Sequence, residues 1–164
     1  MPTTITNYDG SISTTPQKVV KPTTVEEIQA VLSQPNSFPS PVRAMGSYHS
    51  LTPCASSTGT IVDMTAMKKI IKIDPQARTF TAQAGLEMIE ANRELRKQQL
   101  QFMLNIEIGN LTLGSAACCH TKDSLDGVEF GQVNSYVTGV KWVTPAGTLA
   151  EASLTKNPEL LPLI

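Results

Sequence analysis

Hydrophobic positions in the first half of the chain alternate between strand-like and helix-like spacing. Short apolar runs at 18–21, 42–45 and 60–64 predict buried strands. Between the first two runs, apolar residues recur at helical spacing and predict an amphipathic helix. Thr24 and Glu27 have the spacing of a capping box, so we expect this helix to begin just after Thr24.

The second half of the chain begins with a predicted hairpin and continues with a helix. Alternating segments at 69–74 and 78–84 flank the turn residues Pro75 and Gln76, a pattern typical of paired strands. The other predicted elements are an extended segment over 1–17, a helix over 86–99, a short strand at 101–103, an irregular segment over 105–127, strands at 136–144 and 148–151, and a final short helix near Asn157.

This order of elements predicts an α+β fold, in which helices and strands do not alternate regularly. At 164 residues the chain is long enough for one domain or for two small subdomains that share a core. A boundary is expected at the turn near residues 65–68. We therefore expect one subdomain over residues 1–66 and a second over residues 67–164.

Composition and charge narrow the range of partners. The net charge is −1 and no basic stripe is interleaved with aromatic residues, so nucleic acid is not expected as a partner. No apolar stretch approaches the roughly 20 residues needed to cross a bilayer, and no signal-peptide pattern begins the chain. We therefore expect no membrane partner and a cytoplasmic location.

The cysteines agree with a reducing compartment. Cys54, Cys118 and Cys119 are an odd set with one adjacent pair, which does not make a disulfide framework. The chain has no CxxC motif and only two histidines, so no metal site is expected.

The segment from Arg43 to Ser50 carries the strongest chemical signal. It leaves a predicted strand through Gly46 and presents His49 between small or hydroxylated neighbours. A glycine lets the chain turn sharply and point its amides at an anion. An ordinary strand-to-loop turn with a surface histidine is the alternative, and the local pattern does not choose between the two.

A second unusual segment spans residues 108–121. It is largely uncharged and rich in glycine, alanine and serine, so a flat or anionic group can approach its main chain closely. Close packing of a helix on a sheet or on another helix also uses small residues. Taken alone, this segment favours the packing interpretation.

Several segments, each weak by itself, form a specific pattern through their order and spacing. They include a proline and T-V-E-E-I helix at 21–28, a Gly-x-x-His loop within 42–50 and a V-T-P-x-G hairpin within 137–147. The others are 59–64, 67–70 and 80–85. Together they resemble the FAD-binding (PCMH-type) domain of the vanillyl-alcohol oxidase and p-cresol methylhydroxylase flavoprotein family. The Gly-x-x-His loop is most similar to that of the sugar, aldonolactone and sterol oxidase-like members.

The resemblance implies a fold of two subdomains with FAD between them. In such a domain the amides of residues 46–50 hold the pyrophosphate, and the neutral imidazole of His49 attaches covalently to the flavin 8α-methyl group. A noncovalent contact of His49 with the flavin is the alternative. The FAD-binding residues implied are Arg43, Met45, Gly46, Ser47, Tyr48, His49, Ser50, Gly109, Thr112, Gly114, Ala117, Cys118, His120 and Val137.

Some assignments stay open within the resemblance. His120 follows Cys119 where the family commonly has a G-T-H-G sequence, and it either approaches the isoalloxazine or only bonds locally. Cys118 and Cys119 invite a second, cysteinyl link to the flavin, but packing is the favoured interpretation. Tyr48 faces either the flavin or the core.

The resemblance also implies an activity: an FAD-dependent oxidoreductase that acts on the CH–OH group of an alcohol, sugar or lactone, a small-molecule substrate. Family members continue beyond the region of Ile164 into another strand and a substrate-binding domain, which usually carries the catalytic base. We therefore expect no catalytic residue here and a truncated domain, completed by a C-terminal segment or a second chain. The alternatives are a catalytically inactive flavin-fold scaffold module and an interaction domain without flavin.

Overall fold

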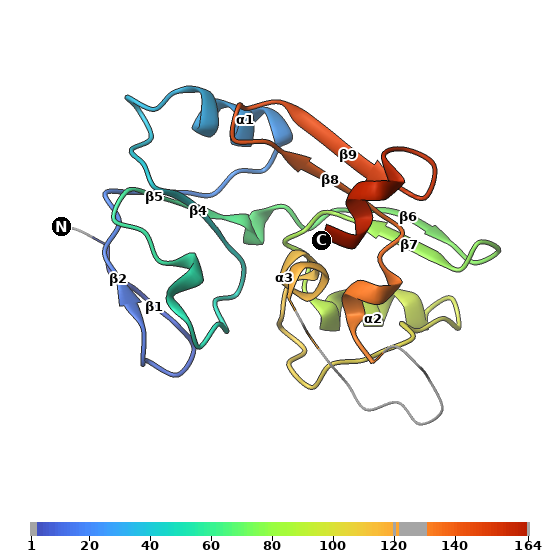
Figure 1. Ribbon diagram of the computed structural model, residues 1–164. Coiled ribbons are helices and arrows are strands. Elements are labelled where there is room, and N and C mark those ends of the chain that lie inside the picture. The colour runs from blue at the N-terminus through green and yellow to red at the C-terminus, as the bar shows by residue number, and fades with distance from the viewer. Residues whose placement is uncertain (1–2, 120, 122–130, 164) are drawn as a thin grey trace. The chain divides into compact units, whose positions relative to one another are not determined.

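The computed structural model describes residues 3–119, 121 and 131–163 of the chain (Figure 1). It divides into two compact units, each considered by itself below. The first comprises Met1–Met67 and Trp142–Ala150, and the second comprises Lys68–Lys141 and Glu151–Ile164. The assignment of residues 1–66 and 67–164 as the two FAD-binding subdomains stays a prediction.

A three-stranded parallel sheet forms the centre of the first unit. β5 (Thr60–Asp63) lies between β3 (Lys18–Val20) and β4 (Val42–Met45), so all three predicted strands are present. The expected burial holds for β5 alone, because β3 and β4 are edge strands whose residues are half-buried or exposed. Ile61 is fully buried and Val62 is nearly so, as expected for the middle strand. Because the strands are parallel, their carboxyl ends lie at one edge of the sheet.

Helix α1 (Val25–Ser33) connects β3 to β4. Both strands run parallel to β5, so a crossover of this kind is needed to join them. Its capping box is present: the Glu27 amide donates to Thr24 Oγ1 at 3.2 Å, and the Thr24 amide donates to the Glu27 carboxylate at 3.3 Å. Val31, on the predicted apolar face, is buried. The predicted helix is therefore confirmed at its start and on its buried face.

The first residues form a small hairpin rather than an unpaired extended segment. β1 (Ile5–Thr6) and β2 (Ser13–Thr14) pair antiparallel. The turn contains Gly10 with φ of 79°, a conformation that Asp-Gly turns favour. The buried Asn7 side chain accepts a hydrogen bond from the Ile12 amide at 3.0 Å and so closes the turn.

The second unit contains the predicted hairpin and the predicted second helix. β6 (Ile70–Asp74) pairs antiparallel with β7 (Thr79–Ala82), and α2 (Met88–Arg96) follows. The residues expected on one side of α2 are all buried: Met88, Ala91 and Leu95. The helical pattern therefore identified the buried face, although α2 is shorter than the predicted 86–99.

Two expectations for the second unit are wrong. Residues 101–103 form no strand: the amides of Gln98 and Leu100 donate back to Leu95, which ends the helix, and Phe102 packs edge-to-face on Phe80. The segment 105–127, expected to be irregular, contains helix α3 (Leu113–Cys118). The sequence of this helix is short and poor in large hydrophobic residues, so no amphipathic pattern predicted it. Residues 122–130 of the segment lie outside the described part.

The chain ends in paired strands and short 3-10 turns. β8 (Gly139–Val143) and β9 (Leu149–Ser153) form a two-stranded sheet, and each strand has residues assigned to both units. The 3-10 helix η3 (Val133–Tyr136) precedes them, and η4 (Pro158–Leu163) replaces the predicted final helix. Within the described ranges, none of the helices has the length and apolar character needed to span a bilayer.

The Asp63 carboxylate, at the end of β5, makes two contacts. It accepts a hydrogen bond from the Thr65 amide at 2.9 Å and so caps the 3-10 helix η2 (Met64–Ala66). It also lies 3.3 Å from the Lys21 ammonium. Burial of this carboxyl raises its pKa, but the Thr65 hydrogen bonds and the Lys21 charge outweigh burial and hold the pKa below its ordinary value.

We predict that Asp63→Asn lowers stability in a pH-dependent way. A carboxyl whose pKa is depressed in the folded state contributes stability above its unfolded pKa of about 4, and this contribution disappears as the pH falls through the folded pKa. Urea unfolding is expected to show a loss of up to about 1 kcal/mol at pH 7, which becomes smaller as the pH falls below about 4. Glu26→Gln, on an exposed position of α1, is the matched control. Equal losses at both pH values would contradict this account.

A second prediction concerns Gly59, which precedes β5. A Cβ built on Gly59 would lie 2.5 Å from the Ser40 carbonyl oxygen and closer still to its carbonyl carbon, and backbone atoms cannot move aside as a flexible side chain does. Gly59→Ala is therefore expected to cost about 2 kcal/mol or more of unfolding free energy. The exposed neighbour Thr58→Ala is expected to change it by less than about 0.5 kcal/mol. Chemical denaturation of both variants measures the difference.

Candidate functional site

The segment singled out by the sequence leaves the carboxyl end of β4, at the edge where parallel sheets usually bind ligands. We call residues 46–50 the histidine loop. From there the chain passes through the 3-10 helix η1 (Pro53–Ala55) and returns to the start of β5. Arg43 and Met45 lie on β4 itself, so the first seven predicted FAD-binding residues lie on one strand and the loop that follows it.

Tyr48 shapes the histidine loop. It adopts φ of 56°, the left-handed region that residues with side chains rarely occupy. Its side chain is buried, and its hydroxyl lies 2.8 Å from the Ser56 hydroxyl. Of the two orientations that the sequence left open, the structure therefore shows the buried one. The reversed backbone at Tyr48 places Ser47 and His49 on either side of a sharp turn.

Two buried polar atoms of the histidine loop have no hydrogen-bond partner among the described residues. They are Ser47 Oγ and His49 Nε2. A buried polar group without a partner costs about 1–3 kcal/mol, so such groups are rare unless a ligand or ordered water satisfies them. Their position beside the carboxyl edge of a parallel sheet fits a polar ligand with hydrogen-bonding groups.

The sequence missed the residues that hold the histidine loop from outside. The Tyr8 ring lies 5.0 Å from the His49 ring between centroids, and the Tyr8 amide donates to the Tyr48 carbonyl at 3.2 Å. Asn7 Nδ2 donates to the Ser50 carbonyl at 3.0 Å. No motif marks this hairpin as part of a site. Its Asn-Tyr-Asp-Gly turn was the available signal, and it indicated only a change of direction.

Cys54 is a third neighbour of the loop that the sequence did not single out for chemistry. Its thiol is exposed, and its sulfur lies 3.2 Å from Ser50 Oγ. This hydrogen bond lowers the pKa of the Cys54 thiol. Ser50 therefore bonds the Cys54 thiol through its hydroxyl and the Asn7 side chain through its carbonyl.

In the second unit, the predicted residues of the small-residue segment are tied to the strand and helix beside them. The Gly114 amide donates to the Ala84 carbonyl at 2.8 Å, and a Cβ at Gly114 would lie 2.9 Å from the Ala84 Cβ. The Ile89 amide donates to the Gly109 carbonyl at 2.7 Å. Thr112 is buried, with its hydroxyl 3.0 Å from that of Ser115. Close packing thus accounts for Gly114, and contact of this segment with FAD stays a prediction.

The remaining predicted residues lie along or after α3. Ala117 and Cys118 are on the helix itself, and His120 lies outside the described residues. Partial burial, together with the neighbouring Cys119, raises the pKa of the Cys118 thiol, which disfavours the nucleophilic thiolate. Val137 follows η3, where its amide donates to the Asn134 carbonyl at 3.1 Å. These residues belong to the second unit and the histidine loop to the first.

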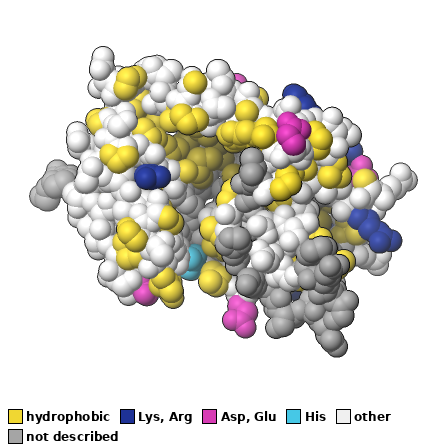
Figure 2. All heavy atoms as spheres, viewed as in Figure 1, with side chains coloured by type: hydrophobic (Ala, Val, Ile, Leu, Met, Phe, Trp, Pro, Cys, Tyr) yellow, Lys and Arg dark blue, Asp and Glu magenta, His cyan; other side chains and the backbone are white. Residues whose placement is uncertain are grey.

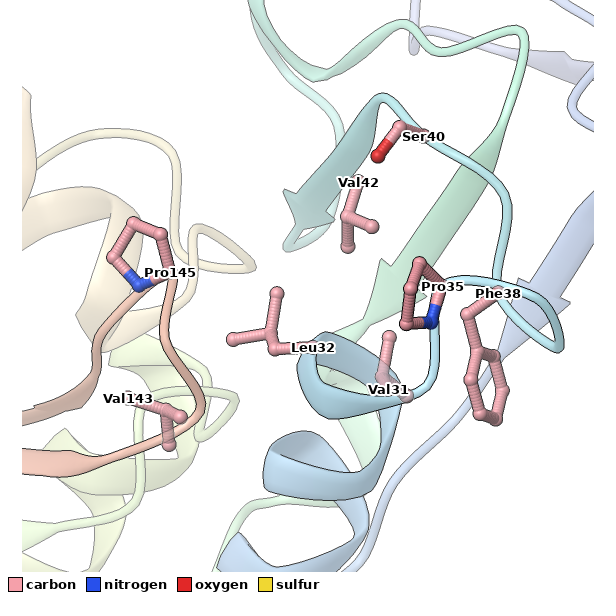
Figure 3. A pocket seen from close by; sticks show the side chains of 8 residues that line it. All are labelled: Val31, Leu32, Pro35, Phe38, Ser40, Val42, Val143 and Pro145. Atoms are coloured by element: carbon pink, nitrogen blue, oxygen red, sulfur yellow. The ribbon is translucent and has the colours of Figure 1, made fainter.

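A separate cleft of about 340 Å³, lined mostly by hydrophobic residues, opens in the first unit (Figure 3). It lies at the Val42 end of β4, whereas the histidine loop follows Met45 at the other end. The cleft is lined by Val31, Leu32, Pro35, Phe38, Ser40, Val42, Val143 and Pro145. Gln29 Nε2 donates to the Gly147 carbonyl at 2.8 Å and so ties α1 to the turn between β8 and β9.

Charge is dispersed over the molecule. On the face shown in Figure 2, the lysine and arginine side chains stand apart from one another and form no basic stripe. Among the residues that the structure describes, no three His, Cys, Asp or Glu side chains come together in a way that suits a metal ion. The histidine loop therefore remains the strongest candidate site.

A protein family described as the FAD binding domain matches residues 16–153 of the chain. L-gulonolactone oxidase of Bos taurus is 25% identical over 154 residues, which cover 94% of this chain and 34% of the relative. L-gulono-1,4-lactone dehydrogenase of Mycobacterium tuberculosis (strain ATCC 25618 / H37Rv) is 24% identical over 147 residues, which cover 90% and 34%. The chain thus spans about a third of the length of these curated relatives.

Solved structures share the fold. Cholesterol oxidase from B. sterolicum has a TM-score of 0.77 at 20% identity, covering 99% of this chain and 34% of that chain. Chitooligosaccharide oxidase has a TM-score of 0.74 at 19% identity, covering 90% and 32%. These likenesses confirm the expected α+β fold of a PCMH-type FAD-binding domain. With the family match extending over most of its length, histidine loop included, the chain belongs to the FAD binding domain family.

Proposed function

We propose that the histidine loop holds the FAD and that His49 attaches it covalently, in the FAD-binding part of an oxidoreductase that acts on the CH–OH group of a small alcohol, sugar or lactone. The observation that carries this proposal is the pair of buried, unpartnered atoms Ser47 Oγ and His49 Nε2. Both lie in the loop at the carboxyl edge of the sheet, within the residues that match the FAD-binding family.

The relatives support the reaction class. Those named above are oxidases or dehydrogenases, and their names specify a lactone, a sterol or an oligosaccharide. All three kinds of molecule are small compounds. We extend oxidation of such a substrate to the protein that contains this chain. We further propose that the substrate contacts and the proton-abstracting base lie on another segment or a second chain.

The residues of the loop suit the cofactor. The Ser47 hydroxyl can donate a hydrogen bond to a phosphate oxygen, and the backbone amides after Gly46 can donate others. When bound, FAD supplies the ring that accepts a hydride. The Tyr48 side chain is buried, with its hydroxyl beside that of Ser56, so Ser47 and His49 are the neighbouring side chains of the loop with polar atoms left for the cofactor.

Covalent attachment requires a nucleophilic nitrogen without a hydrogen-bond partner, and His49 Nε2 meets that condition. Joining the imidazole to the 8α carbon would remove one hydrogen from the methyl group and the N–H hydrogen from the imidazole ring. Dioxygen would accept the two hydrogens with their two electrons and become hydrogen peroxide. The Cys118 thiol, with its raised pKa, is less suited to such a bond.

We predict that His49→Ala abolishes covalent flavin but not FAD binding. The chain is produced with ample flavin and precipitated with acid, which releases noncovalent FAD. The wild-type pellet is expected to stay yellow, with the mass of one FAD added to the chain, whereas the variant releases its FAD into the supernatant.

Two results would contradict parts of the proposal. A wild-type chain that binds FAD but gives a colourless pellet would exclude the covalent link. A His49→Ala chain that keeps acid-stable flavin would move the link to another residue. Cys119→Ala, at an exposed cysteine outside the implied FAD-binding set, serves as the matched control and is expected to behave as wild type.

A further inference from the structure

We infer that Tyr8, in the turn of the N-terminal hairpin, is a positioning residue that orients the His49 imidazole for its bond to the flavin. The inference rests on the proposed covalent link at His49. It concerns residues that the family match does not include, because that match begins at residue 16 and the hairpin occupies residues 5–14.

The hairpin is fastened to the histidine loop on both sides of His49. The Tyr8 amide donates to the carbonyl of Tyr48 at 3.2 Å, and Asn7 Nδ2 donates to the carbonyl of Ser50 at 3.0 Å. These carbonyls belong to the residues immediately before and after His49. Two hydrogen bonds from consecutive hairpin residues therefore fix the backbone that carries the imidazole.

Asn7 makes this attachment rigid. Only 4% of the residue is exposed, and its Oδ1 accepts from the Ile12 amide at 3.0 Å while its Nδ2 also reaches Ser11 Oγ at 3.3 Å. The same side chain thus closes the hairpin turn and bonds the histidine loop. Movement of the loop away from the hairpin would cost the buried Asn7 amide its hydrogen bond to the Ser50 carbonyl, which is unfavourable for a buried polar group.

The Tyr8 ring fixes the side chain. Its centroid lies 5.0 Å from that of the imidazole with an angle of 37° between the planes, in the range of favourable aromatic contacts. Among the described residues the imidazole makes no hydrogen bond, so the ring contact with Tyr8 adds a restraint on its rotation that no hydrogen bond supplies. The Tyr8 residue is 61% exposed, so it does not belong to the core.

Orientation matters because bond formation needs the nitrogen lone pair directed at the reacting carbon. Effective molarity is high only when the reacting atoms are held in a near-attack geometry, and small misplacements cost large factors in rate. An imidazole free to turn about its two side-chain bonds spends little time in such a geometry. The imidazole that contacts the Tyr8 ring is also the one whose Nε2 is buried and has no partner among the described residues.

The first test measures covalent attachment. Purified apo-chain, all 164 residues, is mixed with FAD in air, and acid-stable flavin is followed with time. Tyr8→Leu keeps the backbone bond to Tyr48 and an apolar side chain but removes the ring, and attachment is expected to slow by about tenfold or more. Tyr8→Phe keeps the ring and is expected to restore the wild-type rate.

The matched control is Thr6→Ala in the same hairpin. Thr6 Oγ1 lies 3.2 Å from Ser13 Oγ and is not among the groups that bond the histidine loop. This variant loosens the hairpin without touching the ring and is expected to attach flavin as wild type does. Slowing by Thr6→Ala equal to that by Tyr8→Leu would overturn the inference in favour of general loosening of the hairpin.

The second test needs no flavin. The ring C–H signals of His49 in a carbon-proton correlation spectrum are identified by their loss in His49→Ala, since the chain has only one other histidine. The Tyr8 ring current is expected to shift these signals in wild type and in Tyr8→Phe, and the shift is expected to disappear in Tyr8→Leu. Unchanged His49 signals in Tyr8→Leu would overturn the contact.

The outcomes separate the two proposals. A wild-type chain that forms no acid-stable flavin overturns the covalent link and the attachment role of Tyr8 together. Equal attachment rates for wild type and Tyr8→Leu, with acid-stable flavin in both, overturn the positioning role alone. Slower attachment in Tyr8→Leu, rescue in Tyr8→Phe and a normal Thr6→Ala rate support it.

Discussion

The parallel pairing of β5 with both β3 and β4 is the constraint on which the first unit depends. Parallel neighbours cannot be joined by a tight turn, so each connection must cross from one edge of the sheet to the other. Helix α1 makes the first crossing, and the segment from the histidine loop through η1 makes the second. The connection from β4 to β5 is therefore long because of the topology, and the histidine loop at its start lies at the carboxyl edge of the sheet.

Within that loop, rigidity and freedom are divided between neighbouring residues. Tyr48 is buried and bonded through its hydroxyl, and its positive φ reverses the chain. Ser47 and His49 present polar atoms that the described residues do not satisfy. A loop that is held by one side chain and by the hairpin of Asn7 and Tyr8 can keep its other groups ready for a ligand without refolding. Such preorganisation lowers the entropic cost of binding.

Much of the fold followed from short-range signals. The capping box at Thr24 and Glu27 located the start of α1, and the β5 run was apolar enough to predict a strand. Where the deciding interaction lay far along the chain, prediction failed. Phe102 was expected in a strand, but its partner is the side chain of Phe80. The helix around Gly114 was missed because its stability comes from close contact with Ala84 rather than from its own hydrophobicity.

The sequence by itself determined the element order, the α+β class, the resemblance to an FAD-binding domain and the candidate status of His49. These depend on residue type and spacing within a few turns of chain, which are visible in one dimension. Only the tertiary structure decided the buried orientation of Tyr48, the lack of partners for Ser47 Oγ and His49 Nε2, and the contact of Tyr8 with His49. Burial and the contact between residues 8 and 49 depend on which distant segments pack together, and spacing along the chain does not record that.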